Sequence, residues 1–467
     1  MNNTQRTAEQ LLAANLSRRQ ILKGGLVAGS AAFIAACGGT TTASPSPAAS
    51  AAASAPASAA ASGGGASPSP AGTPVVSYAG TTLHNHTGGY SIPAFEIGLA
   101  HWKEETGGDA TFENIPFDEK PVKIAGMIAT QDSSWDLQYT YDLFMQRFGS
   151  RLLLPLEGKY LGDLSDFLDV AIKGFTTQSD QVVRGLPIHF SMWLWDWNAT
   201  LFEKIGEDGD APPTTYEELF ALAPKFKEAG IIPSVQPWLG SGGTFAAFYF
   251  KHIYNSTGHP MFSEDRTQVM FDGEEGLKTF NTIEAGLKSG WWDPAYLNIT
   301  NEHDAFLVFG KGNVAAVVHS ETPLEPPVEG HKNGPFPGID AGTTGSSPGA
   351  DGLGVSKFSV QQDASWSFFN RLYTPDVAKE ISMSETKYPP TRTSVITDPE
   401  VIALQPLLPA YEAQSKGQVD LWSTPYAYEP VFDDVISRMI KGELTGAAAH
   451  EAAVKGTQDV IIKYLSA

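Results

Sequence analysis

Tryptophan is concentrated in one short stretch of the chain, in a pattern suited to holding flat, polar molecules. Trp193, Trp195 and Trp197 alternate along the sequence, with Asp196 between the last two. In an extended strand this spacing puts the three indoles on one face and the carboxylate on the other. Indole faces pack against flat rings, and a nearby carboxylate accepts hydrogen bonds. The pattern predicts a strand within residues 185–202, either as a ligand-binding wall or as a core strand filled with bulky side chains.

Three other patterns share letters with catalytic or cofactor motifs, and each lacks a required part. His84 and His86 would share a strand face, but zinc requires three or four ligands and no further His or Cys cluster follows. Residues 345–349 match G-x-S-x-G, but Pro348 lacks the backbone N–H that an oxyanion hole requires. Residues 237–243 are glycine-rich but lack the Lys-Ser/Thr of a phosphate loop. We therefore expect no metal and no cofactor.

Alternating strand and helix patterns surround these residues and predict an α/β fold. Strand-like runs near residues 73–83 and 110–117 are each followed by helical spacing, the second over residues 121–129. This order predicts a parallel sheet with right-handed crossovers, in which ligands bind beyond the carboxyl ends of the strands. The segment from His84 to Tyr90 is expected to follow such an end, as a polar loop at the cleft.

Charge excludes one class of partner. The chain has 52 acidic and 31 basic residues, and four of the bases but only one of the acids precede residue 38. The remainder therefore carries 27 basic and 51 acidic residues, a net charge of −24. Such a surface repels phosphate backbones, so we expect no nucleic acid partner. About 390 residues follow the N-terminal region, which suits two lobes better than one core.

The N-terminus has the pattern of an export signal. Arg18 and Arg19 precede a short apolar run over residues 26–36, which ends in Ile-Ala-Ala before Cys37. Twin arginines followed by an apolar segment resemble a twin-arginine signal, and Ile-Ala-Ala-Cys resembles a lipobox, in which Cys37 is lipidated. Residues 38–74 are almost wholly Ser, Ala, Pro, Gly and Thr, which predicts a flexible tether. Cys37 is the only cysteine, so no intramolecular disulfide can form.

Order and spacing along the rest of the chain resemble one protein family. Gly-Leu-Pro at residue 185, the run over residues 197–202, the Pro-Pro-Thr-Thr-Tyr-Glu-Glu segment in residues 211–219 and the Phe-Gly-Lys strand near residue 309 carry the likeness. The final Gly-Glu-Leu-Thr at residue 442 adds to it. The chain resembles the extracellular solute-binding proteins of carbohydrate ABC transporters.

The resemblance implies a periplasmic-binding-protein-like fold, with two α/β lobes joined by several chain crossings and a ligand cleft between them. Segments near residues 185–202, 351–357 and 388–392 resemble the crossings. The expected organisation is a signal peptide at 1–37, a tether at 38–74, a first lobe at 75–189 that returns at 353–386, and a second lobe at 190–352 that returns at 387–467.

The implied function is capture of a sugar or oligosaccharide by a monomeric, lipid-anchored protein on the outer face of the bacterial cytoplasmic membrane, for delivery to an ABC permease. A polyamine or another non-sugar solute is the alternative ligand, because Trp faces and carboxylates also hold cations. We expect the protein not to be an enzyme. The alternative in which it is one is a secreted glycoside hydrolase. The side chains expected to bind the ligand are His84, His86, Tyr90, Trp135, Asp136, Trp193, Trp195, Asp196, Trp238, Trp291, Trp292, Glu321, Asp351, Arg392 and Trp422.

Overall fold

A computed structural model describes most of the chain after residue 75. It covers residues 76–467 except 118, 241–243, 298, 300–301, 321–327, 346–347, 407, 410–423 and 467, and it leaves out the side chains of 90, 190–192, 303, 319–320 and 348. The expectations for Arg18, Arg19, Cys37, Glu321, Trp422 and the side chain of Tyr90 therefore lie outside the described residues.

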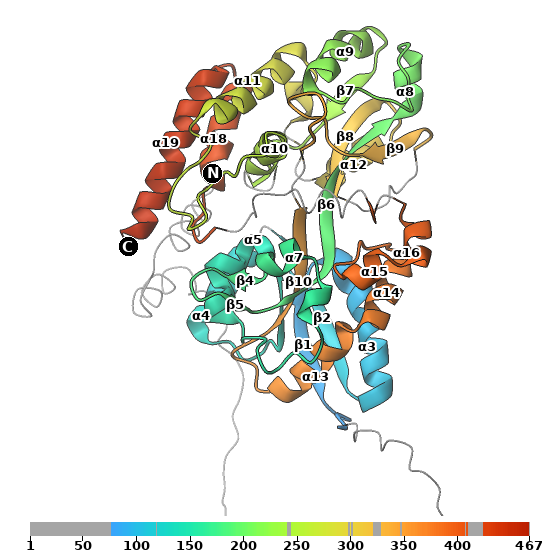
Figure 1. The fold of residues 1–467 in the computed structure, drawn as a ribbon, viewed down its shortest axis with the longest axis vertical. Coiled ribbons are helices and arrows are strands. Elements are labelled where there is room, and N and C mark those ends of the chain that lie inside the picture. Colours follow the sequence, from blue (N-terminus) through green and yellow to red (C-terminus); the bar gives the residue numbers. More distant parts are fainter. Residues whose placement is uncertain are drawn as a thin grey trace, which may run out of the picture. The chain divides into compact units, whose positions relative to one another are not determined.

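The sheet of the first half is mainly parallel at its edge, as the strand–helix order predicts. β1 (Thr82–Thr87) pairs in parallel with β2 (Asp109–Asn114) and with β3 (Leu137–Tyr141). β10 (Pro348–Val355) returns antiparallel to β3 and pairs with β6 (Leu186–Asn198). The order of these strands is β2-β1-β3-β10-β6 (Figure 1).

One long strand joins this sheet to the strands of the second half. Residues 186–192 of β6 pair with β10, and residues 193–197 pair with β8 (Val314–Ser320). β9 (His331–Gly334) also pairs with β6, and β7 (Ile232–Val235) lies parallel to β8. Figure 1 shows β6 running from one half into the other. The predicted strand is confirmed, and it crosses between the two halves.

The helices of the first half cover its sheet and include a segment that was expected elsewhere. α14 packs against α3, α15 and α16, so the chain stays in the first half to residue 404, beyond the expected return at 387. The elements are α3 (Ile92–Thr106), α4 (Lys120–Thr130), α5 (Asp142–Phe144), α6 (Ser150–Leu152), α7 (Asp169–Gly174), β4 (Thr176–Thr177), β5 (Val182–Val183), α13 (Gln362–Leu372), α14 (Pro375–Met383), α15 (Thr393–Ile396) and α16 (Pro399–Leu404).

The helices of the second half begin and end where the sequence signals place them. Thr215 and Glu218 form a capping box at the start of α9, and Thr445 caps α19. Gly442, with φ 74°, follows the end of α18. No helix in the described part of the chain is long and apolar enough to cross a membrane. The elements are α8 (Ala199–Lys204), α9 (Tyr216–Glu228), α10 (Thr244–Asn255), α11 (Glu274–Ser289), α12 (Glu302–Phe309), α18 (Glu429–Ile440) and α19 (Gly446–Leu465).

Candidate functional site

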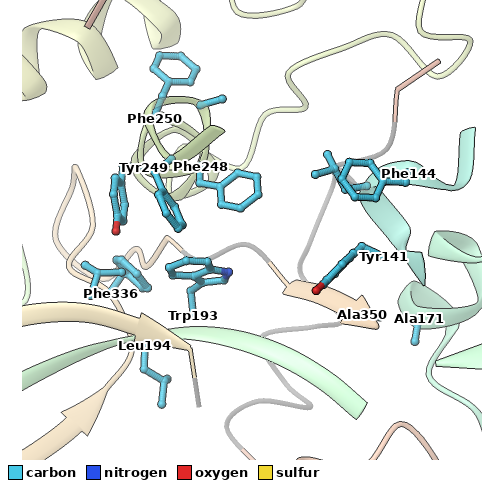
Figure 2. Close-up of a cluster of buried hydrophobic side chains, with 14 of the residues drawn as sticks. Tyr141, Phe144, Ala171, Trp193, Leu194, Phe248, Tyr249, Phe250, Phe336 and Ala350 are labelled. Atoms are coloured by element: carbon cyan, nitrogen blue, oxygen red, sulfur yellow. The ribbon is translucent and has the colours of Figure 1, made fainter. Parts of the chain in front are cut away.

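Aromatic side chains from both halves gather where β3 ends and β6 crosses. Tyr141, the last residue of β3, lies edge-on to Phe117 at 5.0 Å and to Phe144 at 5.8 Å. Trp193, the first residue of β6 to pair within the second half, lies 5.8 Å from Phe248 of α10. Figure 2 shows Trp193 and Phe248 on one side and Tyr141 and Phe144 on the other. Rings from both halves therefore belong to one buried aromatic cluster near the carboxyl end of β3.

A β-bulge between β10 and β6 pairs Asp351 with His189. Asp351 of β10 pairs with His189 of β6, whereas Gly352 pairs with Pro187, so the register shifts by one residue at this point. Only glycine fits there, because a Cβ on Gly352 would lie 1.9 Å from the carbonyl oxygen of Leu186. Bulges re-aim side chains and are frequent next to functional sites.

The carboxylate of Asp351 is the centre of a buried hydrogen-bond network. Its Oδ2 accepts a hydrogen bond from the hydroxyl of Tyr139 at 3.0 Å and lies 3.2 Å from Nε2 of His189. The Tyr139 hydroxyl also lies 2.7 Å from Oγ of Ser91, which follows β1. The His189 ring stacks on Tyr388 at 4.8 Å. Residues from β3, β6, β10 and the segment after α14 thus meet at one carboxylate.

Two ionisable groups next to this network are buried and strongly perturbed. Lys120, at the start of α4, is fully buried and donates from Nζ to the carbonyl of Thr87 at 3.1 Å. Burial lowers the pKa of Lys120 to about 7, although the charge of Asp351 opposes this shift. Burial also raises the pKa of Asp142 to about 7, and Asp351 adds to this shift while Lys251 of α10 opposes it. Both groups therefore change charge near neutral pH.

The arrangement suits reversible binding of a polar solute. Aromatic faces from two sides pack against flat carbon–hydrogen surfaces, and the carboxylates, tyrosines and histidine beneath them exchange hydrogen bonds with hydroxyl groups. Within the described residues, no group of three or more His, Cys, Asp and Glu side chains could hold a metal ion.

Four of the expected site residues lie on β1 and just before β3 instead of beyond the strand ends. His84 and His86 are inside β1, which runs to Thr87, so the strand ends later than the sequence pattern indicated. Asp136 accepts hydrogen bonds from the backbone N–H of His84 and from Ser359. His86 is buried, with Nε2 2.5 Å from Oε1 of Gln138, and its ring lies edge-on to Trp135. These groups bind one another and fix the strands.

The other expected tryptophans belong to the core of the second half. Trp195 stacks on Trp197 at 5.0 Å, which confirms that they share a face, and each is at most 7% exposed. Trp291, Trp292 and Trp238 are 1–2% exposed, and the rings of the last two lie 5.0 Å apart. Trp195, Trp291 and Trp292 border a cavity of about 10 Å³, which has room for about one water molecule and none for a sugar. These indoles fill space instead of lining a cleft.

Asp196 and Arg392 are also bound within the protein. His331 pairs with Asp196 at 2.7 Å, on the β9 side of β6. Arg392 donates to Asp166 and to the hydroxyl of Tyr160, both at 2.6 Å, and its guanidinium lies 4.2 Å from the ring centre of Phe167. The segment 388–392 therefore packs inside the first half and is not the expected third crossing. Among the expected residues, the structure brings Trp193 and Asp351 to the candidate site.

Sequence reasoning missed most of the buried charges at this site. Tyr141 and Asp142 lie at the carboxyl end of β3, so the rule for carboxyl ends of strands could have found them. Lys120 and His189 carry no local signal, because each becomes notable only through partners that are distant in sequence.

Comparison with known proteins gives the chain its family and its fold. Residues 99–410 match the family model of bacterial extracellular solute-binding proteins. A probable amino-acid ABC transporter periplasmic-binding protein of Sinorhizobium fredii is 22% identical over 367 residues, which cover 74% of this chain and 79% of that protein. A probable sugar-binding periplasmic protein of Mesorhizobium japonicum is 25% identical over 226 residues, 44% of this chain and about half (49%) of that relative.

Solved structures with the same architecture cover the folded part almost completely. Maltose-bound MalE3 of T. maritima has a TM-score of 0.69 at 17% identity and covers 81% of this chain and 99% of its own. The GacH receptor of Streptomyces glaucescens has a TM-score of 0.70 at 19% identity, covering 82% and 98%. At these identities the likeness shows the fold, which is that of two-lobed periplasmic solute-binding proteins. The two halves described above are the lobes, and the chain belongs to the family of bacterial extracellular solute-binding proteins.

Proposed function

We propose that this protein is the substrate-binding lipoprotein of an ABC importer, and that it captures a sugar or oligosaccharide between its lobes and delivers it to the permease. The observation that carries the proposal is that Tyr141 and Phe144 of the first lobe lie across from Trp193 and Phe248 of the second (Figure 2), with the buried carboxylate of Asp351 opposite Tyr141 in the sheet. The absence of enzymatic activity is part of the proposal.

Carbohydrates have the two surfaces that this site complements. A pyranose ring presents flat carbon–hydrogen faces, which pack on aromatic rings, and a rim of hydroxyl groups, which both donate and accept hydrogen bonds. Because each lobe contributes rings, a bound solute gains contacts when the lobes approach, and it thereby favours the closed state. The maltose of MalE3 and the acarbose of GacH belong to the same chemical class.

The N-terminal region supports a lipid anchor. In this proposal Arg18 and Arg19 direct export, Cys37 carries the lipid and residues 38–74 tether a monomeric binding protein outside the cytoplasmic membrane. Replacing Cys37 by serine is expected to move the protein from the membrane fraction to the soluble extracytoplasmic fraction, because the lipid attachment is lost. Cell fractionation and immunoblotting measure this change. A Cys37→Ser protein that stays with the membrane would contradict lipidation at this residue.

The ligand class is tested by calorimetry and thermal unfolding of the full chain carrying Cys37→Ser. Saccharides, polyamines and amino acids are compared, the last because of the S. fredii relative. A ligand at 100 times its Kd adds about 2.7 kcal/mol to the free energy of unfolding, which raises Tm by several degrees. We expect stabilisation by a saccharide and no product on incubation. If only polyamines or amino acids stabilise the protein, the ligand is not a saccharide. If the saccharide is consumed during incubation, the protein is a hydrolase.

Two tryptophans of β6 provide a matched pair for placing the site. Trp193 and Trp197 are both 7% exposed, but only Trp193 lies at the junction of the lobes. Trp193→Ala is expected to weaken saccharide binding about tenfold or more, since aromatic stacking and desolvation are lost. Trp197→Ala removes a side chain whose Nε1 donates to the carbonyl of Gly209, and it should lower Tm with unchanged affinity. If Trp197→Ala weakens binding and Trp193→Ala does not, the ligand site does not lie at the junction of the lobes.

A further inference from the structure

Arg147 connects the lobes at a point away from the strands that cross between them. It lies in the π-helical segment Met145–Gly149, directly after α5 in the first lobe. Its Nη2 donates to Oε1 of Glu429 at 2.6 Å and to the carbonyl of Tyr426 at 3.0 Å, and its Nε donates to the carbonyl of Thr424 at 3.4 Å. All three acceptors belong to the second lobe, where the chain leads into α18.

This contact is shielded from water. The side chains of Arg147 and Glu429 are 11% and 7% exposed. Exposed ion pairs contribute little to structure, but separating a buried pair leaves an uncompensated charge in a poorly solvated place. The two backbone carbonyls use further N–H groups of the same guanidinium, so its position is fixed by three acceptors. Separating Arg147 from Glu429 is therefore energetically costly.

A neighbouring side chain makes a second, exposed hydrogen bond between the lobes. Gln178, in the turn between β4 and β5, donates from Nε2 to the carbonyl of Glu264 in the second lobe at 3.0 Å. Its backbone N–H donates to Oε1 of Gln146, the residue before Arg147. The hydroxyl of Tyr426 donates to the carbonyl of Arg266, so the second-lobe partners are also bound to each other. We call the contacts of Arg147 and Gln178 with the second lobe the clasp.

In the described part of the chain the lobes are thus joined at the crossing of β6 beside β10 and, away from these strands, at the clasp. A body held at two points turns only about the line that joins them. If closure broke the clasp, the ligand would have to replace a buried ion pair in every cycle, in addition to the preference of about 10⁴-fold needed to move a population from 1:99 to 99:1. Keeping the clasp intact avoids this requirement.

We propose that Arg147 is a positioning residue, a second pivot that stays bound while the lobes open and close and that defines their axis of rotation. The inference depends on the proposed function only for the need to close around a solute. Without Arg147 the lobes keep the crossings of β6 and β10 but lose the ion pair that joins them away from those strands, and they sample additional directions. Fewer of these orientations bring the aromatic faces of the two lobes together, so apparent affinity falls in proportion to the competent fraction.

Electron–electron distance measurements on the unliganded full chain test the pivot directly. Cys37→Ser removes the native cysteine, and spin labels on Glu104→Cys and Glu228→Cys place one probe on the exposed face of each lobe. Arg147→Met is expected to broaden the distance distribution between the labels. Arg392→Met is the matched control, because Arg392 is buried and its ion pair with Asp166 lies within the first lobe. It should leave the distribution as narrow as in the parent protein.

A double variant separates loss of the pivot from loss of stability. Arg147→Met with Glu429→Met replaces the buried charges by an apolar pair, which restores stability in comparable cases. The proposal expects this protein to unfold like the parent and still to show the broad distribution. If Arg147→Met and the double variant both keep a distance distribution as narrow as the parent's, the proposed pivot at Arg147 is overturned. Because no ligand is added, this result is independent of whether the solute is a sugar.

Discussion

Replacing two neighbouring tryptophans by phenylalanine separates the energy of packing from that of hydrogen bonding. Trp238 and Trp292 are 1% and 2% exposed, and their rings lie 5.0 Å apart in the second lobe. Each substitution removes the same atoms from the same core, so the cavity terms are similar. The indole N–H groups differ, because Nε1 of Trp292 donates to Oε1 of Gln236 at 3.0 Å, whereas Nε1 of Trp238 is buried and has no hydrogen-bond partner among the described residues.

The expected difference follows from the cost of unpaired polar groups. Trp292→Phe leaves Oε1 of Gln236 without this donor, and an unsatisfied buried group costs about 1–3 kcal/mol. Trp238→Phe removes a donor that is already unsatisfied, which returns a similar amount. The shared loss of packing cancels in the comparison. Trp292→Phe should therefore lower the free energy of unfolding by about 2 kcal/mol or more beyond the effect of Trp238→Phe.

Urea unfolding followed by far-ultraviolet circular dichroism measures both values in the Cys37→Ser protein. The slope of the free energy of unfolding against urea concentration should be the same in both variants and the parent, so that the shift in midpoint reports stability alone. Both variants should bind the ligand with the affinity of the parent, since both side chains lie in the core. Equal destabilisation, or a greater loss in Trp238→Phe, would refute the assignment of hydrogen bonds. A loss of ligand affinity in either variant would show that this indole contacts the ligand.

Two further predictions concern buried charges. The folded protein holds a proton on Asp142 up to a pKa of about 7, whereas the unfolded chain releases it near 3.8, so this group lowers stability as pH rises from about 4 to 7. Asp142→Asn should remove a pH-dependent loss on the order of 2–4 kcal/mol, and parallel stability–pH curves for variant and parent would contradict this. Arg392→Met should cost about 3–5 kcal/mol, because Asp166 loses its buried partner, and should leave ligand affinity unchanged; a weaker affinity with unchanged unfolding would place Arg392 in the site.

The sequence by itself determined the order of elements and several of their ends. The alternating indoles predicted a strand, and they lie in β6. This prediction succeeded because the two-residue repeat of a strand is a local property of the chain. The capping box at Thr215 and Glu218 and the glycine at 442 are local signals of the same kind, since caps depend on a few adjacent residues. The family resemblance also rested on order and spacing, and the family model confirmed it.

Only the tertiary structure decided which side chains are available to a ligand. Trp193 packs on Phe248 at the junction of the lobes, whereas Trp195, two residues further along the same strand, borders the small cavity inside the second lobe. Arg392 was expected at a crossing, but Asp166 and Tyr160 hold it inside the first lobe. Burial and pairing depend on what covers a side chain, and those covering groups come from segments up to hundreds of residues away. A local pattern contains the type of a residue but not its neighbours in space, so the site itself emerged only from the fold.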